Sequence, residues 1–410
     1  MDAIDPPPER PAAASPPGGP RQRPGGAGSA ARAGGLSRFE GRLAAGAVGW
    51  LRALLGTLLA GGSVGAVHAA TLPPDQAEAL FHSYDGGGVK ANGPAFLVRK
   101  SLADRVSLSA QVYVDAVSNA SIDVVTTASP FRETRHAVQL GAQTLVRDAT
   151  ISVSASSSRE PDYIADAVNV DLTNEVFGGM TTVSLGYTRG HDQVGKKGLG
   201  WIDQALHWQY RAGVTQILTP TWLVSLNAEA IADSGYLGSP YRAARVFGAA
   251  VPERNPRTRS SRALELRSVV DTSAWVARSS LRASVRGYAD NWQIRATTVE
   301  LGGRKRLGER WLLDATLRAY RQSKALFYSD NASTQTLYLS RNRQLSDFND
   351  TAVGARLNYD WPGLAPGHKL VLTASAERMQ YRYRDFTDLR TGRPYAFDAN
   401  VLQLYATATY

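Results

Sequence analysis

The chain has 410 residues, of which 43% are hydrophobic, with no cysteine and a formal net charge of +10. The lack of cysteine excludes disulfides, thiolate-bound iron–sulfur clusters, c-type haem attachment and a lipidated N-terminal cysteine. A mean hydropathy of −0.25 is too polar for a bundle of membrane helices, but it is compatible with a membrane β-barrel, in which every second residue faces the lumen. The positive residues form no helical stripe or recognisable nucleic-acid-binding module, so we expect anionic lipopolysaccharide, and not nucleic acid, as their counter-charge.

The N-terminal residues 1–69 are expected to be a disordered leader followed by a secretory signal peptide. Residues 1–36 are rich in Pro, Gly, Ala and Arg and cannot bury a core. Arg38 and Arg42 then precede an apolar segment at 51–67 that ends in small residues, which predicts cleavage after Ala69. A signal anchor is the alternative, although the segment is short and interrupted by glycine. The leader holds seven Arg and four acidic residues, so its removal would leave a net charge of +7.

Residues 70–104 have two interpretations. The prolines at 73 and 74 predict a short helix through Ala79, and the glycines at 86–88 then break the chain. The apolar segment at 95–98 can pair with the next strand, in which case residues 79–102 add a hairpin to the fold. Otherwise the segment is a periplasmic or lumenal plug.

From residue 105 to residue 410 apolar and polar residues alternate, with no helical segment of any length. This period of two predicts an all-β fold, a transmembrane antiparallel up-and-down β-barrel. Fourteen strands are expected, or 16 with the hairpin, at 106–115, 136–142, 151–155, 168–172, 183–187, 206–212, 222–228, 264–266, 281–285, 292–302, 311–317, 351–357, 370–374 and 401–410. In the tenth, Ile294 and Ala296 are out of phase with Val299 and Leu301, which predicts a bulge.

The connections differ in length according to their position in this series. Those after the even strands are short, whereas most of those after odd strands are long: 118–131, 159–165, 190–204, 233–261, 322–348 and 384–399. Short periplasmic turns opposite long external loops are typical of outer-membrane barrels. Tryptophans 222, 311 and 361 are expected at the inner membrane interface, and Trp201 and Trp292 at the outer one.

The last ten residues predict how the barrel closes. They alternate strictly and end on the aromatic Tyr410, as expected of a closing strand whose end lies at the periplasmic interface. We therefore predict that Tyr410 is a barrel-closing signal and that the chain lies in the bacterial outer membrane, with lipid, lipopolysaccharide and the barrel assembly machinery as partners.

Charged residues of both signs are expected to face the lumen. The candidate site residues are Arg211, Glu229, Arg267, Arg282, Arg286, Arg318, Arg356 and Glu377, with Asp115, Asp171 and Glu265 also on the inward face. A nearly balanced interior is consistent with a weakly selective aqueous pore or with a salt-bridged, closed barrel, because rings of one sign would be needed for strong ion selectivity.

The sequence predicts no catalytic residue, cofactor or metal site. His191–Asp192, at the top of a strand, and the strand residues His136 and His207 are the candidates for hydrolase chemistry, but no Ser-His-acid spacing is recognisable. Six scattered histidines without cysteine form no ligand cluster for a transition metal. The remaining alternative is calcium on three loop acids, Asp385, Asp388 and Asp398.

Several blocks resemble an uncharacterised family of proteobacterial outer-membrane proteins, classified as a domain of unknown function. They are LFHSYDGGGV (80–89), VSNASIDVVTTASP (117–130), EVFGGMTTVSLGY (175–187), RVFGAAVPER (245–254), ALFYSDNA (325–332) and ANVLQL (399–404). The resemblance covers roughly residues 72–410. It implies an outer-membrane barrel without an established activity, and genes for flavin-attaching and thioredoxin-like proteins nearby.

Three functions are compatible with the sequence. The first is a channel or transport barrel for small solutes. The second is a non-conducting binding or scaffold barrel in an envelope assembly, with a redox link implied by the resemblance, whose loops 233–261 and 322–348 meet a partner; the identity of any periplasmic partner is left open. The third, a membrane-embedded hydrolase, is disfavoured, and we predict that the chain is not an enzyme.

Overall fold

The computed structural model describes residues 72–119, 131–196 and 198–410. The predicted leader and signal peptide lie outside these residues. Within them, no helix is long and apolar enough to cross a membrane.

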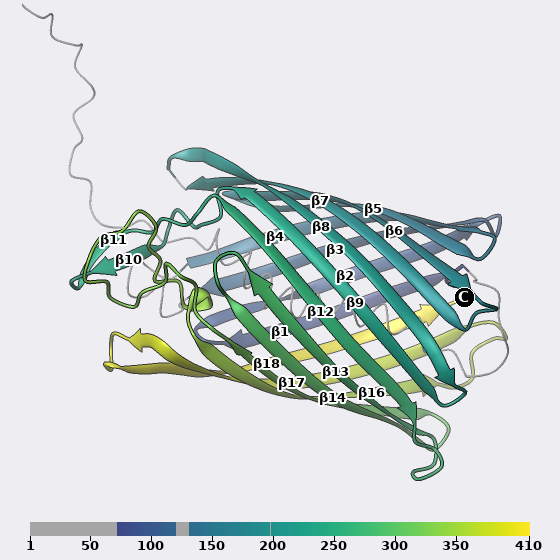
Figure 1. Cartoon of the computed structure of the whole chain (residues 1–410). Coiled ribbons are helices and arrows are strands. Elements are labelled where there is room, and N and C mark those ends of the chain that lie inside the picture. The colour runs from purple at the N-terminus through teal and green to yellow at the C-terminus, as the bar shows by residue number, and fades with distance from the viewer. Residues whose placement is uncertain (1–71, 120–130, 197) are drawn as a thin grey trace, which may run out of the picture.

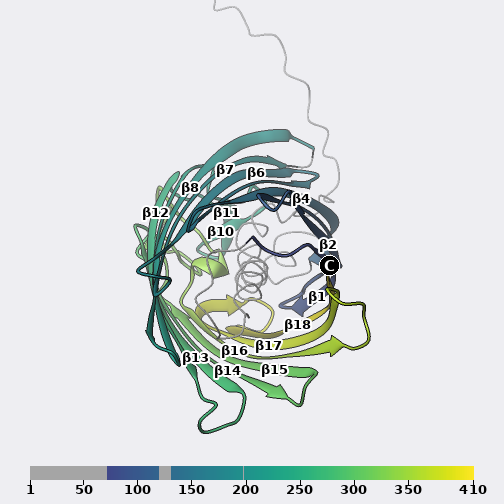
Figure 2. The ribbon, with the colours of Figure 1, turned by 90° about the vertical axis from the view of Figure 1, so that its right-hand side faces the viewer.

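The described residues form a closed antiparallel barrel of 16 strands (Figures 1 and 2). Each strand pairs with its neighbours in the barrel order, and β1 closes the ring by pairing with β18 from Gln76↔Thr409 to Gly86↔Ala399. The strands are β1 (Gln76–Gly86), β2 (Val89–Leu102), β3 (Val106–Asn119), β4 (Phe131–Val146), β5 (Ala149–Glu160), β6 (Tyr163–Val176), β7 (Thr181–Lys196), β8 (Gly200–Thr219), β9 (Trp222–Gly235), β12 (Thr258–Asp271), β13 (Ser279–Asp290), β14 (Arg295–Leu307), β15 (Trp311–Gln322), β16 (Phe348–Trp361), β17 (Lys369–Asp388) and β18 (Arg393–Thr409).

The N-terminal hairpin β1–β2 decides between the two strand counts. It confirms the 16-strand alternative, whereas the predicted helix through Ala79 is wrong, because β1 begins at Gln76. Asp75, placed before β1, accepts hydrogen bonds from the Ser101 backbone N–H and the Lys100 Nζ, both at 2.5 Å. The turn consists of Gly87 and Gly88, with φ of 59° and 82°, and two positive φ values in a two-residue hairpin turn strongly favour glycine. The glycine run is therefore a hairpin turn.

The outer face of the barrel is apolar. Residues such as Leu140, Leu226, Leu264, Val353 and Leu404 are 47–62% exposed, although they are large and hydrophobic. Each is separated by one position from side chains that point inward, as the pleat of a strand requires. A belt of this kind needs a hydrocarbon environment, which confirms the prediction of a transmembrane barrel.

The two ends of the barrel differ in their connections (Figure 1). At the end where the C-terminus lies, the connections are short, from two residues (147–148 and 220–221) to seven residues (272–278 and 362–368). At the other end, the β9–β12 connection contains the hairpin β10 (Ala243–Val246) and β11 (Ala249–Pro252), and the β15–β16 connection contains the 3-10 helix η1 (Arg343–Leu345). We call these two ends the turn end and the loop end.

Three connections that were expected to be long loops are largely strand. The β5–β6 connection is only residues 161–162, β17 and β18 are joined by residues 389–392, and β7 continues to Lys196. A strand needs only about 9–11 residues to cross the bilayer, whereas β8 and β17 have 20 residues each. These strands therefore continue beyond the membrane, paired with their neighbours.

The irregular stretch at 292–302 contains no bulge, so that prediction was wrong. The pairing of β14 with β13 and with β15 runs without a register shift. Ile294 and Ala296 are buried, whereas Val299 and Leu301 are exposed on the outer face. Trp292, expected at the outer interface, is only 4% exposed and packs with Ile294, Ala325, Tyr328 and Leu345. The apparent phase change arises because the apolar residues at the start of this stretch, Ile294 and Ala296, point inward, whereas the later ones, Val299 and Leu301, point outward to the lipid face.

Candidate functional site

The inward face of the barrel is crossed by ion pairs that link strands two positions apart. Arg211 on β8 lies 2.6 Å from Asp171 on β6, and Arg282 on β13 lies 2.9 Å from Asp314 on β15. Each arginine passes over a glycine of the intervening strand. A Cβ atom on Gly186 would lie 2.7 Å from the Arg211 Nε, and one on Gly302 would lie 2.5 Å from the Arg282 Nε. The glycines therefore make room for these pairs.

The eight predicted lumen residues fall into two groups. Five of them take part in ion pairs: Arg211 with Asp171, Arg286 with Glu229 (2.7 Å), Arg282 with Asp314, and Arg318 with Asp350 (2.7 Å). The other three are Arg267, half-buried beside Ser225 and Ser284 in the strand register, and Arg356 and Glu377, which line a pocket. Of the further inward acids, Asp115 binds Arg135 and lies 2.6 Å from His82 Nε2, and Glu265 is half-buried.

The pocket lies on the inner wall formed by β13, β15, β16, β17 and β18. It has about 570 Å³ of empty space, part of it continuous with solvent. Its charged lining residues are Arg282, Arg318, Arg356, Asp314 and Glu377. Arg282 and Arg318 are held by carboxylates, whereas the Arg356 guanidinium lies 5.8 Å from the ring centre of Tyr405 and has no ion pair within the described part of the chain. Arg356 is therefore the pocket cation that is most available to a solute.

The long β15–β16 connection folds into the barrel mouth. Residues 340–346, which include η1, are all buried, and Gln322 Nε2 donates to the backbone oxygens of Gln344 and Ser346 at 2.9 Å. Arg343 lies over the rings of Tyr395 and Phe397 in a large aromatic cluster. The segment also meets the other long connection, because Arg254 pairs with Leu339 and Val246 with Ala332. The two loops thus contact each other and narrow the loop end.

The three histidines predicted as hydrolase candidates have different surroundings. His136 is exposed opposite Arg159, and His191 Nε2 lies 2.8 Å from the Gln204 side chain. His207 is held between two carboxylates, with Nδ1 2.5 Å from Asp233 and Nε2 3.2 Å from Asp192. Both ring nitrogens of His207 are thus in contact with carboxylates.

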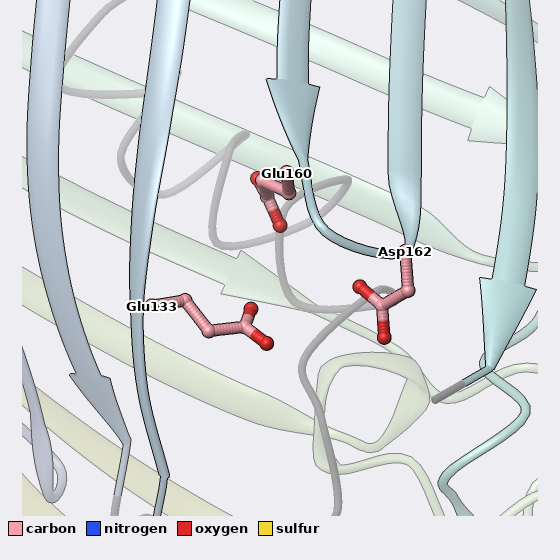
Figure 3. A group of neighbouring side chains, drawn as sticks. All are labelled: Glu133, Glu160 and Asp162. Atoms are coloured by element: carbon pink, nitrogen blue, oxygen red, sulfur yellow. The ribbon is translucent and has the colours of Figure 1, made fainter. Parts of the chain in front are cut away.

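Within the described residues, one group of acidic side chains is close enough to hold a metal ion. It consists of Glu133, Glu160 and Asp162 (Figure 3). The loop acids named from the sequence are separate, since Asp388 pairs with Arg390 and Asp398 with Arg378. No sequence motif indicates this cluster, because residue 133 comes beside residues 160 and 162 only when β4 pairs with β5 in the folded barrel.

Other functional side chains were missed for a similar reason. Asp314, Asp350 and Tyr405, the partners of Arg282, Arg318 and Arg356, lie on strands whose relative register cannot be read from alternation alone. Alternation predicts which face of the sheet a residue occupies, but it does not predict which residue of a nearby strand lies beside it. The one available signal was a glycine at an inward position, such as Gly186 or Gly302.

Comparison with known proteins identifies the family. A family model described as "Protein of unknown function (DUF3570)" matches residues 59–201 and 201–377. No curated protein matches the chain. Among solved structures, it is similar to the siderophore receptor PirA from Pseudomonas aeruginosa (11% identity over 77% of this chain and 60% of the receptor, TM-score 0.42). It is also similar to a Pseudomonas aeruginosa FadL homologue, with 13% identity over 81% of this chain and 89% of the homologue and a TM-score of 0.37. A bacterial polysaccharide outer membrane secretin is similar with 7% identity over 81% of this chain and 97% of the secretin and a TM-score of 0.48.

The chain spans about 60% of the length of the PirA receptor. The family match, in contrast, extends over most of the chain and includes strands from both halves of the barrel. The chain therefore belongs to the DUF3570 family of proteins of unknown function, and its described residues fold as a closed antiparallel barrel of 16 strands.

Proposed function

We propose that this protein is an outer-membrane channel that conducts small hydrophilic solutes, with a weak preference for anions. The observation that carries the proposal is the pocket on the inner wall, where Arg356 lies among Arg282, Arg318 and Glu377 without an ion pair in the described part of the chain. Most other lumen charges are paired, and a lumen of paired charges is polar without a strong field of one sign. Because no carboxylate in the described part of the chain pairs with Arg356, this cation gives the pocket a modest preference for anions.

Planar-bilayer recording of the purified barrel tests this proposal. Discrete conductance steps are expected, with a reversal potential in a KCl gradient that favours chloride slightly. Arg356→Glu is expected to move that potential toward cation preference, because it replaces the available positive charge in the pocket with a negative one.

Arg262→Glu is the matched control, because Arg262 is exposed on the outer face of β12 beside Leu264. It should leave the reversal potential unchanged. A silent bilayer, or equal shifts from both variants, would count against conduction through this pocket.

The buried segment 340–346 favours the second candidate function, a non-conducting binding or scaffold barrel. Replacement of residues 329–346, which include this segment, by a short Gly-Ser linker separates the two. A channel narrowed by this loop should show a larger unit conductance after the replacement, whereas a scaffold barrel should bind its envelope partner less well and conduct only after the change.

We further propose that the chain is exported, cleaved after Ala69 and inserted in the outer membrane. N-terminal sequencing of protein from the outer-membrane fraction is expected to begin at Ala70. An intact Met1, or recovery of the protein from the cytosol, would contradict this prediction.

A further inference from the structure

Three carboxylates meet at the loop end, apart from the lumen pocket. Glu133 lies on β4, Glu160 ends β5 and Asp162 belongs to the turn before β6. One oxygen of each lies within 4.8 Å of the others, and Figure 3 shows the three groups turned toward a common space. Three carboxylates at this separation repel one another strongly unless a cation or protons lie between them.

The cluster lies on the aqueous side of the lipid belt. On β4 and β5 the outer face is apolar at Leu140 and Val153, but farther toward the loop end it presents His136 opposite Arg159. A histidine and an arginine facing outward mark the end of the hydrocarbon region. Glu160 and Asp162 follow Arg159 and therefore lie beyond it.

Asp162 supplies a second observation that points to a ligand. The residue is only 3% exposed, and its Oδ2 accepts a hydrogen bond from the Tyr241 hydroxyl. Its Oδ1 is buried and has no hydrogen-bond partner in the part of the chain that the structure describes. The Asp162 carboxylate points toward the two glutamates in Figure 3. Buried carboxylate oxygens are normally hydrogen-bonded, ion-paired or bound to a metal.

The positive charge that acts on Glu160, Arg135, is already engaged by another carboxylate. Its guanidinium donates two hydrogen bonds to Asp115. Glu160 itself lies beside the carboxylates of Glu133 and Asp162. A divalent cation between the three groups would offset the repulsion that Arg135 leaves.

We propose that Glu133, Glu160 and Asp162 form a calcium-binding site at the loop end. All three ligands are oxygens, and Ca²⁺ accepts 6–8 oxygen ligands in irregular geometry, with water completing the shell. Mg²⁺ demands near-ideal octahedral geometry, which makes it the weaker candidate for three carboxylates from two strands and a turn. Calcium would join β4 to the β5–β6 turn and, through the Tyr241–Asp162 hydrogen bond, steady the long connection that carries β10 and β11.

Terbium luminescence tests the site directly. The full-length protein is purified from outer membranes in non-ionic detergent, washed with chelator and titrated with Tb³⁺, an oxygen-seeking calcium substitute. Excitation of tyrosine is expected to sensitise bound terbium, because the Tyr241 hydroxyl is bonded to Asp162. Calcium should displace the signal with a dissociation constant on the order of 10⁻⁴–10⁻³ M, the range of extracellular modules, and magnesium should compete less well.

Glu160→Gln and Asp162→Asn remove ligand charge with little change in shape. Each is expected to weaken calcium competition at least about tenfold, since affinity follows the ligand charge count. Glu309→Gln is the matched control, because the Glu309 side chain is 86% exposed and lies at the turn end with Arg278. It should bind calcium as the wild type does.

Melting temperature provides a second measurement. With chelator present, Glu160→Gln should melt at or above the wild-type temperature, because it relieves repulsion. With calcium, the wild type should gain stability and Glu160→Gln should not. The proposal is overturned if the wild type shows no saturable calcium binding, or if Glu160→Gln and Asp162→Asn bind calcium as tightly as Glu309→Gln.

Discussion

Leu226→Arg is expected to destabilise the folded barrel by about 2–4 kcal/mol, the cost of placing arginine on the lipid face at the bilayer midplane. Leu226 is 47% exposed in the middle of β9. Its register partners are Val214 on β8 and Leu266 on β12, both apolar and exposed on the same face. The guanidinium would therefore lie in hydrocarbon with no polar partner nearby. Denaturant unfolding of the barrel in lipid vesicles measures the loss.

Asn227→Arg is the matched variant, one residue away on the inner face. Asn227 pairs in register with Gly213 and Glu265, so a new guanidinium there meets water and a carboxylate. A smaller loss of stability than for Leu226→Arg is expected. A shift of one residue exchanges the two faces of a strand. Equal losses at both positions would therefore mean that the register of β9 is wrong.

The strands could be predicted because a membrane barrel wall imposes two different solvents on alternate residues. In β9, for example, Leu226 and Ala228 face lipid while Asn227 and Glu229 face inward, and the sequence carries that alternation plainly. The alternation no longer indicates which face is outward where the inner face of a strand packs against apolar side chains and not against water. Ile294 packs in an inner apolar cluster and Ala296 is also buried on the inner face, so the two residues mimic a phase error that the backbone does not have.

Loop lengths and side-chain partners were less predictable. Polar residues in β7 and β8 beyond the lipid belt look like loop, although they continue as paired strands to Lys196 and from Gly200. The pairing of Arg282 with Asp314 depends on the stagger between β13 and β15 and on Gly302 between them. Likewise, the calcium ligands come from strands and a turn that only the closed sheet places together.

Deletion of Tyr410 is expected to reduce the folded, heat-modifiable form of the protein several-fold while translation and export continue. Tyr410 directly follows β18, the strand that closes the ring on β1, and its backbone N–H donates to the backbone carbonyl oxygen of Asp75 at 3.2 Å. Its ring is half-exposed at the turn end and lies 5.1 Å from Lys100 Nζ. An aromatic ring beside a lysine suits the membrane interface.

The size of the loss in folded yield distinguishes a role of Tyr410 in assembly from a role in the stability of the folded barrel. Loss of one hydrogen bond at a strand end costs about 1 kcal/mol, which would change the equilibrium stability of a closed barrel only slightly. A large loss of folded yield together with near-normal resistance of the surviving barrels to denaturant would therefore place Tyr410 in the closing step, where we propose that the assembly machinery reads the terminal aromatic residue. Until that step is complete, the edges of β1 and β18 present unpaired backbone groups to lipid, at several kcal/mol each. Tyr410→Phe, which keeps the ring and the backbone bond, should assemble normally. If the deletion gave normal yield and heat-modifiability, the role of Tyr410 as a closing signal would be refuted.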